Sequence, residues 1–338
     1  MRSSALILIP SLIAAVATGC RIPDRERFAR KEIHTLKLKP GGELRATTFN
    51  GSINVEGWDR DEVSLEAEIL EKREGDIAFS AESKDGLVEI MAEQKNRRTF
   101  ALTFGQSNGV SYTLRIPSKS VARLKTSNGR VEVREIDSDV YANTSNGRIT
   151  AERIGGTARL ETRNGSIRAE AVAGGLVAAT SNGNNEAKGV RGNVDLRTSN
   201  GRIEVRDVLG NADVNTSNGA LVAELIGGDL KGGTRNGRIE IQKVSGAIDL
   251  STSNGSIKAD GLDGKGKGIR LVTTNGSIDV TLGGAEGMLD ARTSRGSRVH
   301  LEIPNIQPTV DGQVTKAKIG NSDQPIELKT TYGGITVR

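Results

Sequence analysis

Apolar and polar residues alternate along most of this chain with a period of two. In the stretch that begins at Thr198, Ile203 and Val205 alternate with charged residues, and Ala212 and Val214 do so again a few residues later. Alternation over about five residues is typical of a half-buried β-strand. The stretch therefore predicts two short strands, joined by a Ser-Asn-Gly corner and by a second corner that contains glycine, because Asn and Gly tolerate positive φ.

This pair of strands recurs at a fixed spacing. The motif Thr-Ser-Asn-Gly, any residue, Ile or Val begins every 18 residues, at Thr126, Thr144, Thr162, Thr180, Thr198, Thr216, Thr234 and Thr252. An isolated copy begins at Thr48, the spacing loosens to 21 and 20 residues before Thr273 and Thr293, and residues 331–337 resemble a degenerate last copy. A fixed short period indicates a stacked repeat.

Two folds can accommodate the repeat. Asn-Gly is a strong hairpin signal, so one of them is a long antiparallel meander. A meander would leave one apolar face of a very wide sheet uncovered, whereas a coil turns that face inward. Only a coil needs a constant period, because an insertion displaces every like residue from the one below. We therefore predict an all-β fold, a parallel β-solenoid of 18-residue coils, with right-handed winding by the rule for parallel crossovers.

Stacked coils place like residues about 4.8 Å apart. Aliphatic residues then form a ladder in the core, and the corner asparagines form an amide ladder whose side chains hydrogen-bond to one another. The predicted corner ladder consists of Asn128, Asn146, Asn164, Asn182, Asn200, Asn218, Asn236, Asn254 and Asn275. We expect it to be architectural. Asn185 occupies an aliphatic position, which predicts a local dent or a ligand contact, and Arg295 replaces the corner asparagine in the copy at Thr293.

The N-terminus has the pattern of an exported protein. Arg2 precedes an apolar run at residues 5–16, too short for a comfortable membrane span, and small residues lead to Cys20. Cys20 is the only cysteine, so no internal disulfide can form. The segment resembles the lipobox of bacterial lipoproteins, which implies cleavage before Cys20 and a lipid on it. Because Arg21 rather than Asp follows, the resemblance favours the outer membrane, facing the periplasm.

The remaining chain divides by regularity. Residues 21–32 are polar and mix charges, and residues 33–125 alternate but have longer predicted strands and larger loops than the repeat. A coil end exposes unpaired strand edges, so an atypical terminal segment is expected. We predict a lipoprotein signal peptide at 1–19, a tether at 20–32, an irregular N-terminal β cap at 33–125 and the solenoid at 126–338.

Composition offers little chemistry. The chain has 42 glycines in 338 residues, 3% aromatic residues and a formal net charge of +5, which is too mild for a nucleic-acid partner. The sequence lacks metal-ligand spacing, a phosphate loop and a nucleophile elbow, so we predict no catalytic residue, cofactor or metal. His34 and His300, the only histidines, are expected at the surface. The oligomeric state is left open.

Charged residues also follow the repeat. Arg130, Arg148, Arg202 and Arg238 occupy equivalent positions after the corner glycine, and three of them precede a glutamate two residues on. Such alternation is typical of a solvated face that discourages edge pairing. These arginines are nevertheless candidate contacts for an anionic ligand, such as lipid phosphate or an acidic polysaccharide.

Several motifs together resemble a known family. Pro-Gly-Gly at 40–42 is followed by Asn-Gly-Ser-Ile-Asn-Val-Glu-Gly-Trp-Asp-Arg-Asp-Glu-Val at 50–63, then by Tyr-Thr-Leu-Arg-Ile-Pro at 112–117 and the serial Thr-Ser-Asn-Gly copies. This combination, over residues 33–338, resembles a bacterial β-strand-repeat family of unknown function that is labelled as adhesins. The resemblance implies a β-solenoid of the cell envelope and brings no catalytic residues.

Two functions compete at this stage. The first is a lipid-anchored, non-catalytic binding or structural surface for an envelope polysaccharide or protein. The second is a solenoid lyase or glycosidase, against which the scarcity of aromatic sugar platforms argues. Three or more acidic residues converging in a groove would favour the enzyme, and an even face of alternating charge would favour the binding surface.

Overall fold

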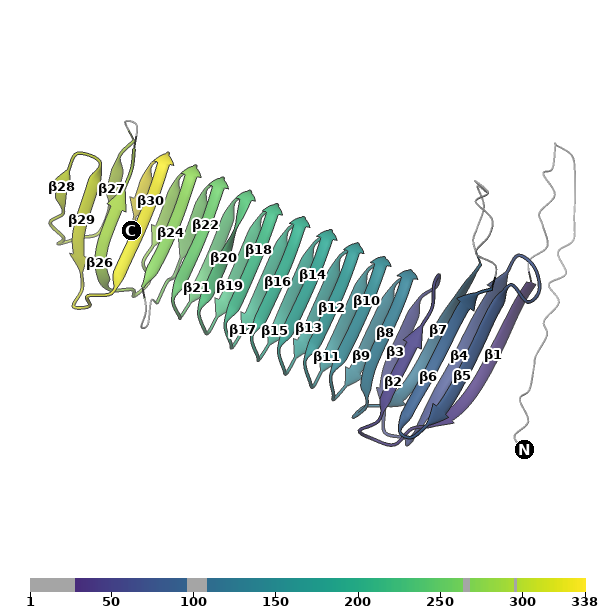
Figure 1. Ribbon diagram of the computed structural model, residues 1–338. Coiled ribbons are helices and arrows are strands. Elements are labelled where there is room, and N and C mark those ends of the chain that lie inside the picture. Colours follow the sequence, from purple (N-terminus) through teal and green to yellow (C-terminus); the bar gives the residue numbers. More distant parts are fainter. Residues whose placement is uncertain (1–27, 96–107, 264–267, 295–296) are drawn as a thin grey trace, which may run out of the picture. The chain divides into compact units, whose positions relative to one another are not determined.

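The computed structural model describes residues 28–95, 108–263, 268–294 and 297–338, and every regular element in these ranges is a β-strand (Figure 1). The chain forms two compact units, Met1–Gly156 and Thr157–Arg338. Within each unit the strands build two sheets, which we call sheet A and sheet B. No helix in the described ranges is long and apolar enough to cross a membrane.

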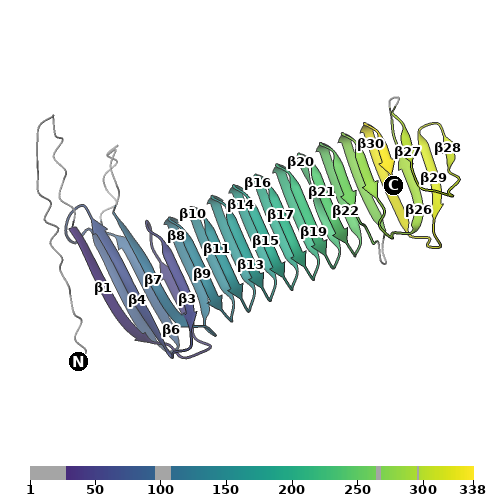
Figure 2. The same cartoon turned by 180° about the vertical axis from the view of Figure 1, so that it is seen from behind.

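In the second unit each coil contributes one strand to each sheet (Figures 1 and 2). Sheet A contains, in spatial order, β13 (Ile167–Val172), β15 (Asn185–Val190), β17 (Ile203–Val208), β19 (Leu221–Ile226), β21 (Ile239–Val244), β23 (Ile257–Asp260), β25 (Ile278–Thr281), β31 (Ile335–Val337) and β27 (Val299–Leu301). Sheet B contains β12 (Ala158–Asn164), β14 (Leu176–Asn182), β16 (Val194–Asn200), β18 (Ala212–Asn218), β20 (Leu230–Asn236), β22 (Ile248–Asn254), β24 (Ile269–Asn275), β30 (Pro325–Tyr332), β26 (Gly287–Arg292), β29 (Val314–Ile319) and β28 (Thr309–Asp311).

Neighbouring coils pair in parallel with like residues in register. Thr180 pairs with Thr198, and Thr198 pairs with Thr216. On sheet A, Ile203 pairs with Leu221, and both side chains are fully buried. These pairings confirm the parallel β-solenoid and exclude the antiparallel meander, because like corners lie above one another instead of at opposite edges of a sheet.

The C-terminal end departs from chain order. The last coil, β30 and β31, lies between the coil of β24 and β25 and the strands β26 and β27. Thr330 pairs with Thr273 and Tyr332 pairs with Asn275, so the degenerate last copy begins at Thr330. Antiparallel β29 and β28 follow β26 at the edge of sheet B. Arg295 lies outside the described ranges.

The first unit shows a similar insertion. Its sheet A contains, in spatial order, β1 (Phe28–Lys37), β4 (Glu62–Glu71), β7 (Gly109–Pro117), β3 (Ile53–Trp58), β9 (Val131–Ile136) and β11 (Ile149–Ile154). Its sheet B contains β10 (Val140–Asn146), β8 (Val121–Asn128), β2 (Glu43–Thr47), β6 (Leu87–Gln94) and β5 (Ile77–Lys84). The isolated copy at Thr48 therefore forms a coil, β2 and β3, between that of β6 and β7 and that of β8 and β9.

Antiparallel strands complete the first unit. β1 pairs with β4, β4 pairs with β7, and β5 pairs with β6. β1 begins at Phe28, so the last five residues of the predicted tether belong to a strand. The alternation was hard to recognise there because the residues of β1 on the side of β5 include Arg30, Glu32 and His34 instead of apolar residues.

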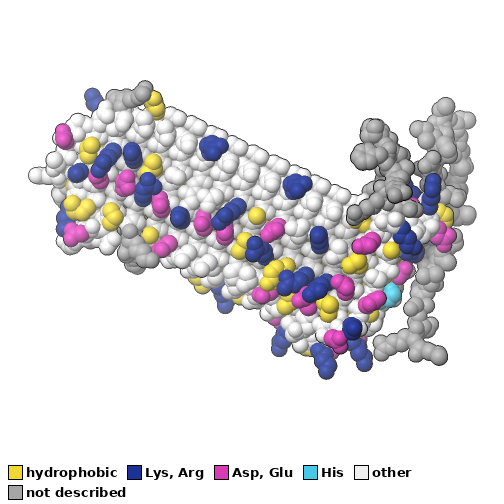
Figure 3. Space-filling model, viewed as in Figure 1, with side chains coloured by type: hydrophobic (Ala, Val, Ile, Leu, Met, Phe, Trp, Pro, Cys, Tyr) yellow, Lys and Arg dark blue, Asp and Glu magenta, His cyan; other side chains and the backbone are white. Residues whose placement is uncertain are grey.

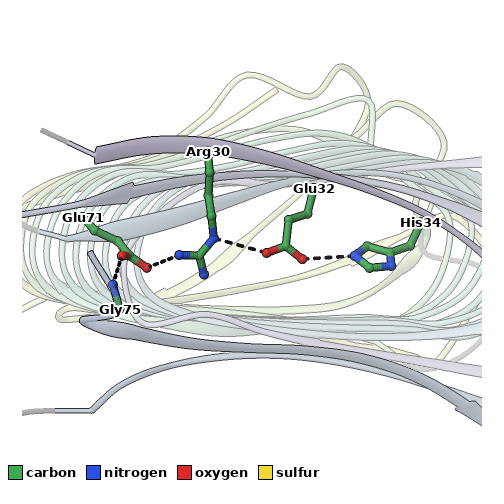
Figure 4. Close-up of polar contacts among 5 residues, drawn as sticks. All are labelled: Arg30, Glu32, His34, Glu71 and Gly75. Carbon is green, nitrogen blue, oxygen red and sulfur yellow. Dashed lines mark hydrogen bonds and ion pairs between the residues drawn. The ribbon is translucent and has the colours of Figure 1, made fainter. Parts of the chain in front are cut away.

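A polar cluster lies beside the core at this end (Figure 4). The carboxylate of Glu71, whose side chain is 1% exposed, accepts hydrogen bonds from Arg30 at 2.8 Å and from the backbone N–H of Gly75 at 2.7 Å. Glu32 bridges Arg30 and His34, at 3.2 Å from each. Inward-pointing charges on an edge strand oppose pairing with a further strand, and a buried carboxylate needs such partners.

Candidate functional site

The Ser-Asn-Gly corner is held by three sets of contacts that repeat from coil to coil. In the second unit each ladder asparagine from Asn182 to Asn275 donates through Nδ2 to Oδ1 of the asparagine before it, at 2.7–2.8 Å. In the first unit Asn146 donates to Asn128, and Asn128 donates to Asn50. The ladder asparagines are therefore occupied with one another along one side of each coil.

Threonine and glycine complete the corner. The hydroxyl of Thr198 is buried and donates to the carbonyl of Gly183 at 3.0 Å, and Thr216 and Thr234 make the same bond to Gly201 and Gly219. A Cβ on Gly201 would lie 1.9 Å from the Gly183 carbonyl oxygen. Gly201 is not among the glycines with positive φ. Close approach of adjacent coils, and not the expected left-handed backbone, requires glycine here.

The four predicted arginines do not form one stripe. Arg130, Arg202 and Arg238 each pair with the glutamate two residues on, at 3.1–3.2 Å. Ala220 stands between Arg202 and Arg238 in the second unit. Ser166 and Asn184 take equivalent positions, where the side chain of each accepts a hydrogen bond from the next coil's backbone.

Asn185 lies in the core. Its side chain is 1% exposed, and Nδ2 donates to the carbonyls of Arg197 at 2.8 Å and Ala178 at 3.4 Å, across the gap between the sheets. Its Oδ1 is buried and has no partner among the described residues. Asn185 is thus a polar defect in the aliphatic ladder and does not reach the surface.

A second hydrogen-bonded row, which we did not predict, runs along the other corner. Oδ1 of Asn193 accepts from the backbone N–H of Asn211, Asn211 accepts in the same way from Asp229, and Asp229 accepts from Ala247, at 2.8–3.0 Å. Its signal in the sequence was Asn or Asp at a spacing of 18 residues immediately before the apolar start of a strand.

The outer faces carry charges of both signs. On sheet A of the second unit, Arg168 contacts Glu170 in its own strand and Glu186 in the next coil, and Arg206 does the same with Glu204 and Glu224. Figure 3 shows basic and acidic side chains interspersed along the viewed face of this unit, and a border with few charges, most of them basic, where the sheet B strands end. The even face expected of a solvated surface is therefore present.

One hollow lies on the sheet B face of the second unit. It has a volume of about 480 Å³, and Asp195, Asp213 and Asp229 are among its lining residues. Asp195 binds Arg197 through both oxygens, at 2.8 and 3.0 Å, Asp213 accepts from Asn215, and Asp229 accepts from Ala247. The three carboxylates line one groove, but each is bonded to its own partner.

A second hollow lies on the first unit, beside β2. It has a volume of about 420 Å³ and is lined by the turn at 39–42, by Glu43 and Arg45, and by the turn at 85–87. Burial alone would raise the pKa of the Glu43 carboxyl, but hydrogen bonds from Arg45 and Arg123 outweigh it and hold the pKa below its ordinary value. The sequence did not predict that Arg45 and Arg123 would meet.

The other predicted residues lie apart from these hollows. His34 is a half-buried residue of β1 in the polar cluster, and its ring centroid lies 5.9 Å from that of Phe79. His300 is exposed next to Glu302. No group of three or more His, Cys, Asp or Glu in the described part of the chain could hold a metal ion. Cys20 lies outside the described residues.

The stacked coils, two sheets and hydrogen-bonded corners define the class as a β-solenoid repeat protein. The chain belongs to the Toastrack DUF4097 family, whose model matches residues 43–338. Among the curated proteins, none matches this sequence.

The solved structures that are similar to this chain include two that are named for adhesion. One is a putative cell adhesion protein from Clostridium sporogenes, with 12% identity and a TM-score of 0.22 over 91% of this chain and 98% of that one. The other is a putative adhesin from Bacteroides fragilis, with 15% identity and a TM-score of 0.37 over 70% of this chain and 97% of that one.

Proposed function

We propose that this protein is anchored by lipid in the bacterial cell envelope and that its solenoid is a non-catalytic, adhesin-like binding surface. The observation that supports this most directly is the even pairing of charges on the outer faces. Arg206, for example, contacts both Glu204 in its own strand and Glu224 in the next coil.

The hydrogen-bonded corners make the solenoid stiff, and a stiff surface suits a binding role. The amide ladder and the Thr-to-Gly bonds tie each coil to the next, so surface side chains are held on a stiff frame at a spacing of about 4.8 Å. A preorganised surface loses less conformational entropy when a ligand binds. A repetitive partner, such as an envelope polysaccharide, or an extended protein segment would suit such a frame.

The anchor is part of the proposal. Cys20 follows an apolar stretch at residues 5–16 and is the only cysteine. A lipid on Cys20 would hold the solenoid at a membrane, and Arg21 favours the outer membrane facing the periplasm.

A solenoid glycosidase or lyase is the second candidate, and the hollow with three aspartates is the observation in its favour. Glycoside hydrolysis needs two carboxyl groups on either side of the scissile bond. Asp195 would have to leave Arg197 to take part. Release of reducing ends from an envelope polysaccharide by the wild-type chain, and its loss in Asp213→Asn, would establish the enzyme.

Localisation and capture in cells test the main proposal. The wild-type chain should be found in the outer-membrane fraction, and Cys20→Ala should appear in the soluble fraction. Arg21→Ala keeps the cysteine and should remain in a membrane. Crosslinking in cells should recover an envelope polysaccharide or protein with the wild type. Equal solubility of wild type and Cys20→Ala would contradict the anchor, and recovery of no envelope component would contradict the binding role.

A further inference from the structure

Two arginines from distant parts of the sequence lie side by side on the outer face of sheet B in the first unit. Arg45 in β2 and Arg123 in β8 are register partners, and Tyr141 in β10 is the register partner of Arg123 on its other side. Arg45 meets Arg123 because the coil of β2 and β3 is inserted beside β8 and β9, whereas Tyr141 follows Arg123 in the regular stack. We call Glu43, Arg45, Arg123 and Tyr141 the arginine-pair site.

One carboxylate oxygen holds both arginines in the same way. Nε of Arg45 and Nε of Arg123 both contact Oε1 of Glu43, the latter at 3.1 Å. The guanidinium of Arg123 also lies 4.0 Å above the ring of Tyr141, which fixes its plane. Nε of each arginine faces Glu43, and both side chains are partly exposed, so a ligand in solvent can reach the outer ends of the two guanidinium groups.

Glu132 is shared by Arg130 and Arg134, and Glu204 by Arg202 and Arg206, but in both cases the two arginines contact different oxygens. Arg197 binds Asp195 through Nε and Nη2, and Arg292 binds Asp290 through the same two atoms. Each of these has one carboxylate to itself. In the arginine-pair site two arginines on neighbouring strands share one carboxylate oxygen, and like charges on neighbouring strands repel each other. An additional anion would relieve that repulsion.

The surroundings have room for such an anion. The hollow of about 420 Å³ is lined by Glu43 and Arg45 of the site and by Lys39 and Asp85, whereas Arg123 and Tyr141 lie beside it. The side chains of Arg45 and Arg123 are 50% and 44% exposed, so a ligand can reach them from solvent. Glu89, the register partner of Arg45 on β6, repels anions on that side, and Lys125 attracts them on the side of β8.

We infer that the arginine-pair site binds the carboxylate or phosphate groups of an anionic envelope glycopolymer. Guanidinium groups bind carboxylates and phosphates through paired hydrogen bonds. Hydrogen bonds between charged groups are stronger than those between neutral groups. A sugar ring next to the anionic group would lie over the shallow hollow beside Arg45. This inference rests on the proposed binding function and gives it a ligand class and a location.

The test is calorimetric titration of the full-length chain with two probes. Trigalacturonic acid supplies carboxylates, and glycerol 3-phosphate supplies phosphate. Arg123→Gln should weaken binding of the preferred probe about tenfold or more, the loss expected for one charged hydrogen-bonding group. Arg123→Lys should restore little of it, because lysine keeps the charge but not the fork. Added salt should weaken binding, since the contact is exposed.

Arg115→Gln is the matched control, because Arg115 is an exposed arginine on sheet A of the same unit and pairs with Glu56. It should leave binding unchanged. Unchanged unfolding temperatures will show that the variants fold. Wild-type affinity that is insensitive to Arg123→Gln, or absence of binding to either probe, would overturn the inference.

Binding to isolated envelope fractions separates this inference from the proposed function. Wild-type binding that Arg123→Gln abolishes supports both. Envelope binding that persists in Arg123→Gln overturns the arginine-pair site and leaves the proposed function. Probe binding that depends on Arg123, with no binding to envelope fractions, supports the site and contradicts the proposed function.

Discussion

At the scale of single residues, each regular coil contains one strained backbone position that the repeat motif does not reveal. In the second unit the residue before the last of each six-residue sheet A strand has positive φ, for example Ala171 at 57°, Asp207 at 57° and Leu225 at 58°. The residue with positive φ forms a β-bulge. In β13, for example, Glu170 and Ala171 both point outward and Val172 points inward. Residues with a Cβ tolerate this conformation poorly, yet glycine occupies the position in only two of the coils described in this unit, at Gly189 and Gly261.

Ala171→Gly should therefore stabilise the chain. Relief of about 1–2 kcal/mol of left-handed strain is partly offset by about 0.5–1 kcal/mol of backbone entropy. Urea denaturation should show a small gain in unfolding free energy. Ala173→Gly is the matched control, because Ala173 is exposed like Ala171 but has no positive φ. The Ala173→Gly chain should have a lower unfolding free energy than the wild type. Equal effects of the two substitutions would contradict the strain argument.

Asn185 permits a second prediction at this scale. A buried carbonyl without a partner costs about 1–3 kcal/mol, whereas each hydrogen bond from Nδ2 contributes about 0.5–1.5 kcal/mol. Asn185→Leu, which keeps the branching and adds apolar contact with the ladder, should therefore raise the unfolding temperature modestly. Asn185→Ala, which adds no contact, should lower it. A loss of stability in Asn185→Leu would indicate that Oδ1 has a partner such as an internal water.

At the scale of the elements, the corners decide how closely coils stack. Each corner glycine lies against the carbonyl oxygen of the corner glycine in the coil before. A Cβ added to Gly201, Gly219 or Gly237 would lie 1.9 Å from that oxygen. The same coils are joined by threonine and asparagine side chains on either side of that glycine. The Thr-x-Asn-Gly motif is therefore one stacking device in which each residue contacts the neighbouring coil.

Gly201→Ala should disrupt this device. The clash is with a backbone carbonyl in a sheet, which cannot move without breaking ladder hydrogen bonds, so a loss of about 3 kcal/mol or more is expected. Gly175→Ala is a suitable comparison, because the nearest atom to a Cβ there is 3.4 Å away. Thermal unfolding followed by circular dichroism will separate them. Similar unfolding temperatures would mean that the coils can shift apart at the corner.

At the scale of the whole molecule, each unit contains a coil that is out of chain order. In the first unit β2 and β3 enter between later strands, and in the second unit β30 and β31 enter between earlier ones. The final strands β30 and β31 are therefore internal layers of the stack. β26 depends on β30 as its parallel neighbour, and β27 depends on β31.

Removal of residues 321–338 should consequently release more than the deleted strands. We expect β26–β29 to lose protection against hydrogen exchange, because β26 and β27 lose a paired neighbour and β29 and β28 are held through β26. Strands β14–β19 keep all their neighbours and should remain protected. Lys329→Ala, an outward residue of β30, should change neither region. Continued protection of β26–β29 after the deletion would show that these strands fold without the last coil.

The sequence alone determined the coil length, the two strands per coil and the stacked corner asparagines. It could do so because residues 18 apart are neighbours in a regular stack, so the period is itself the contact map. The tertiary structure alone decided the order of the terminal coils and the meeting of Arg45 with Arg123. No period relates those residues, and their register depends on which strand edges the irregular segments cover.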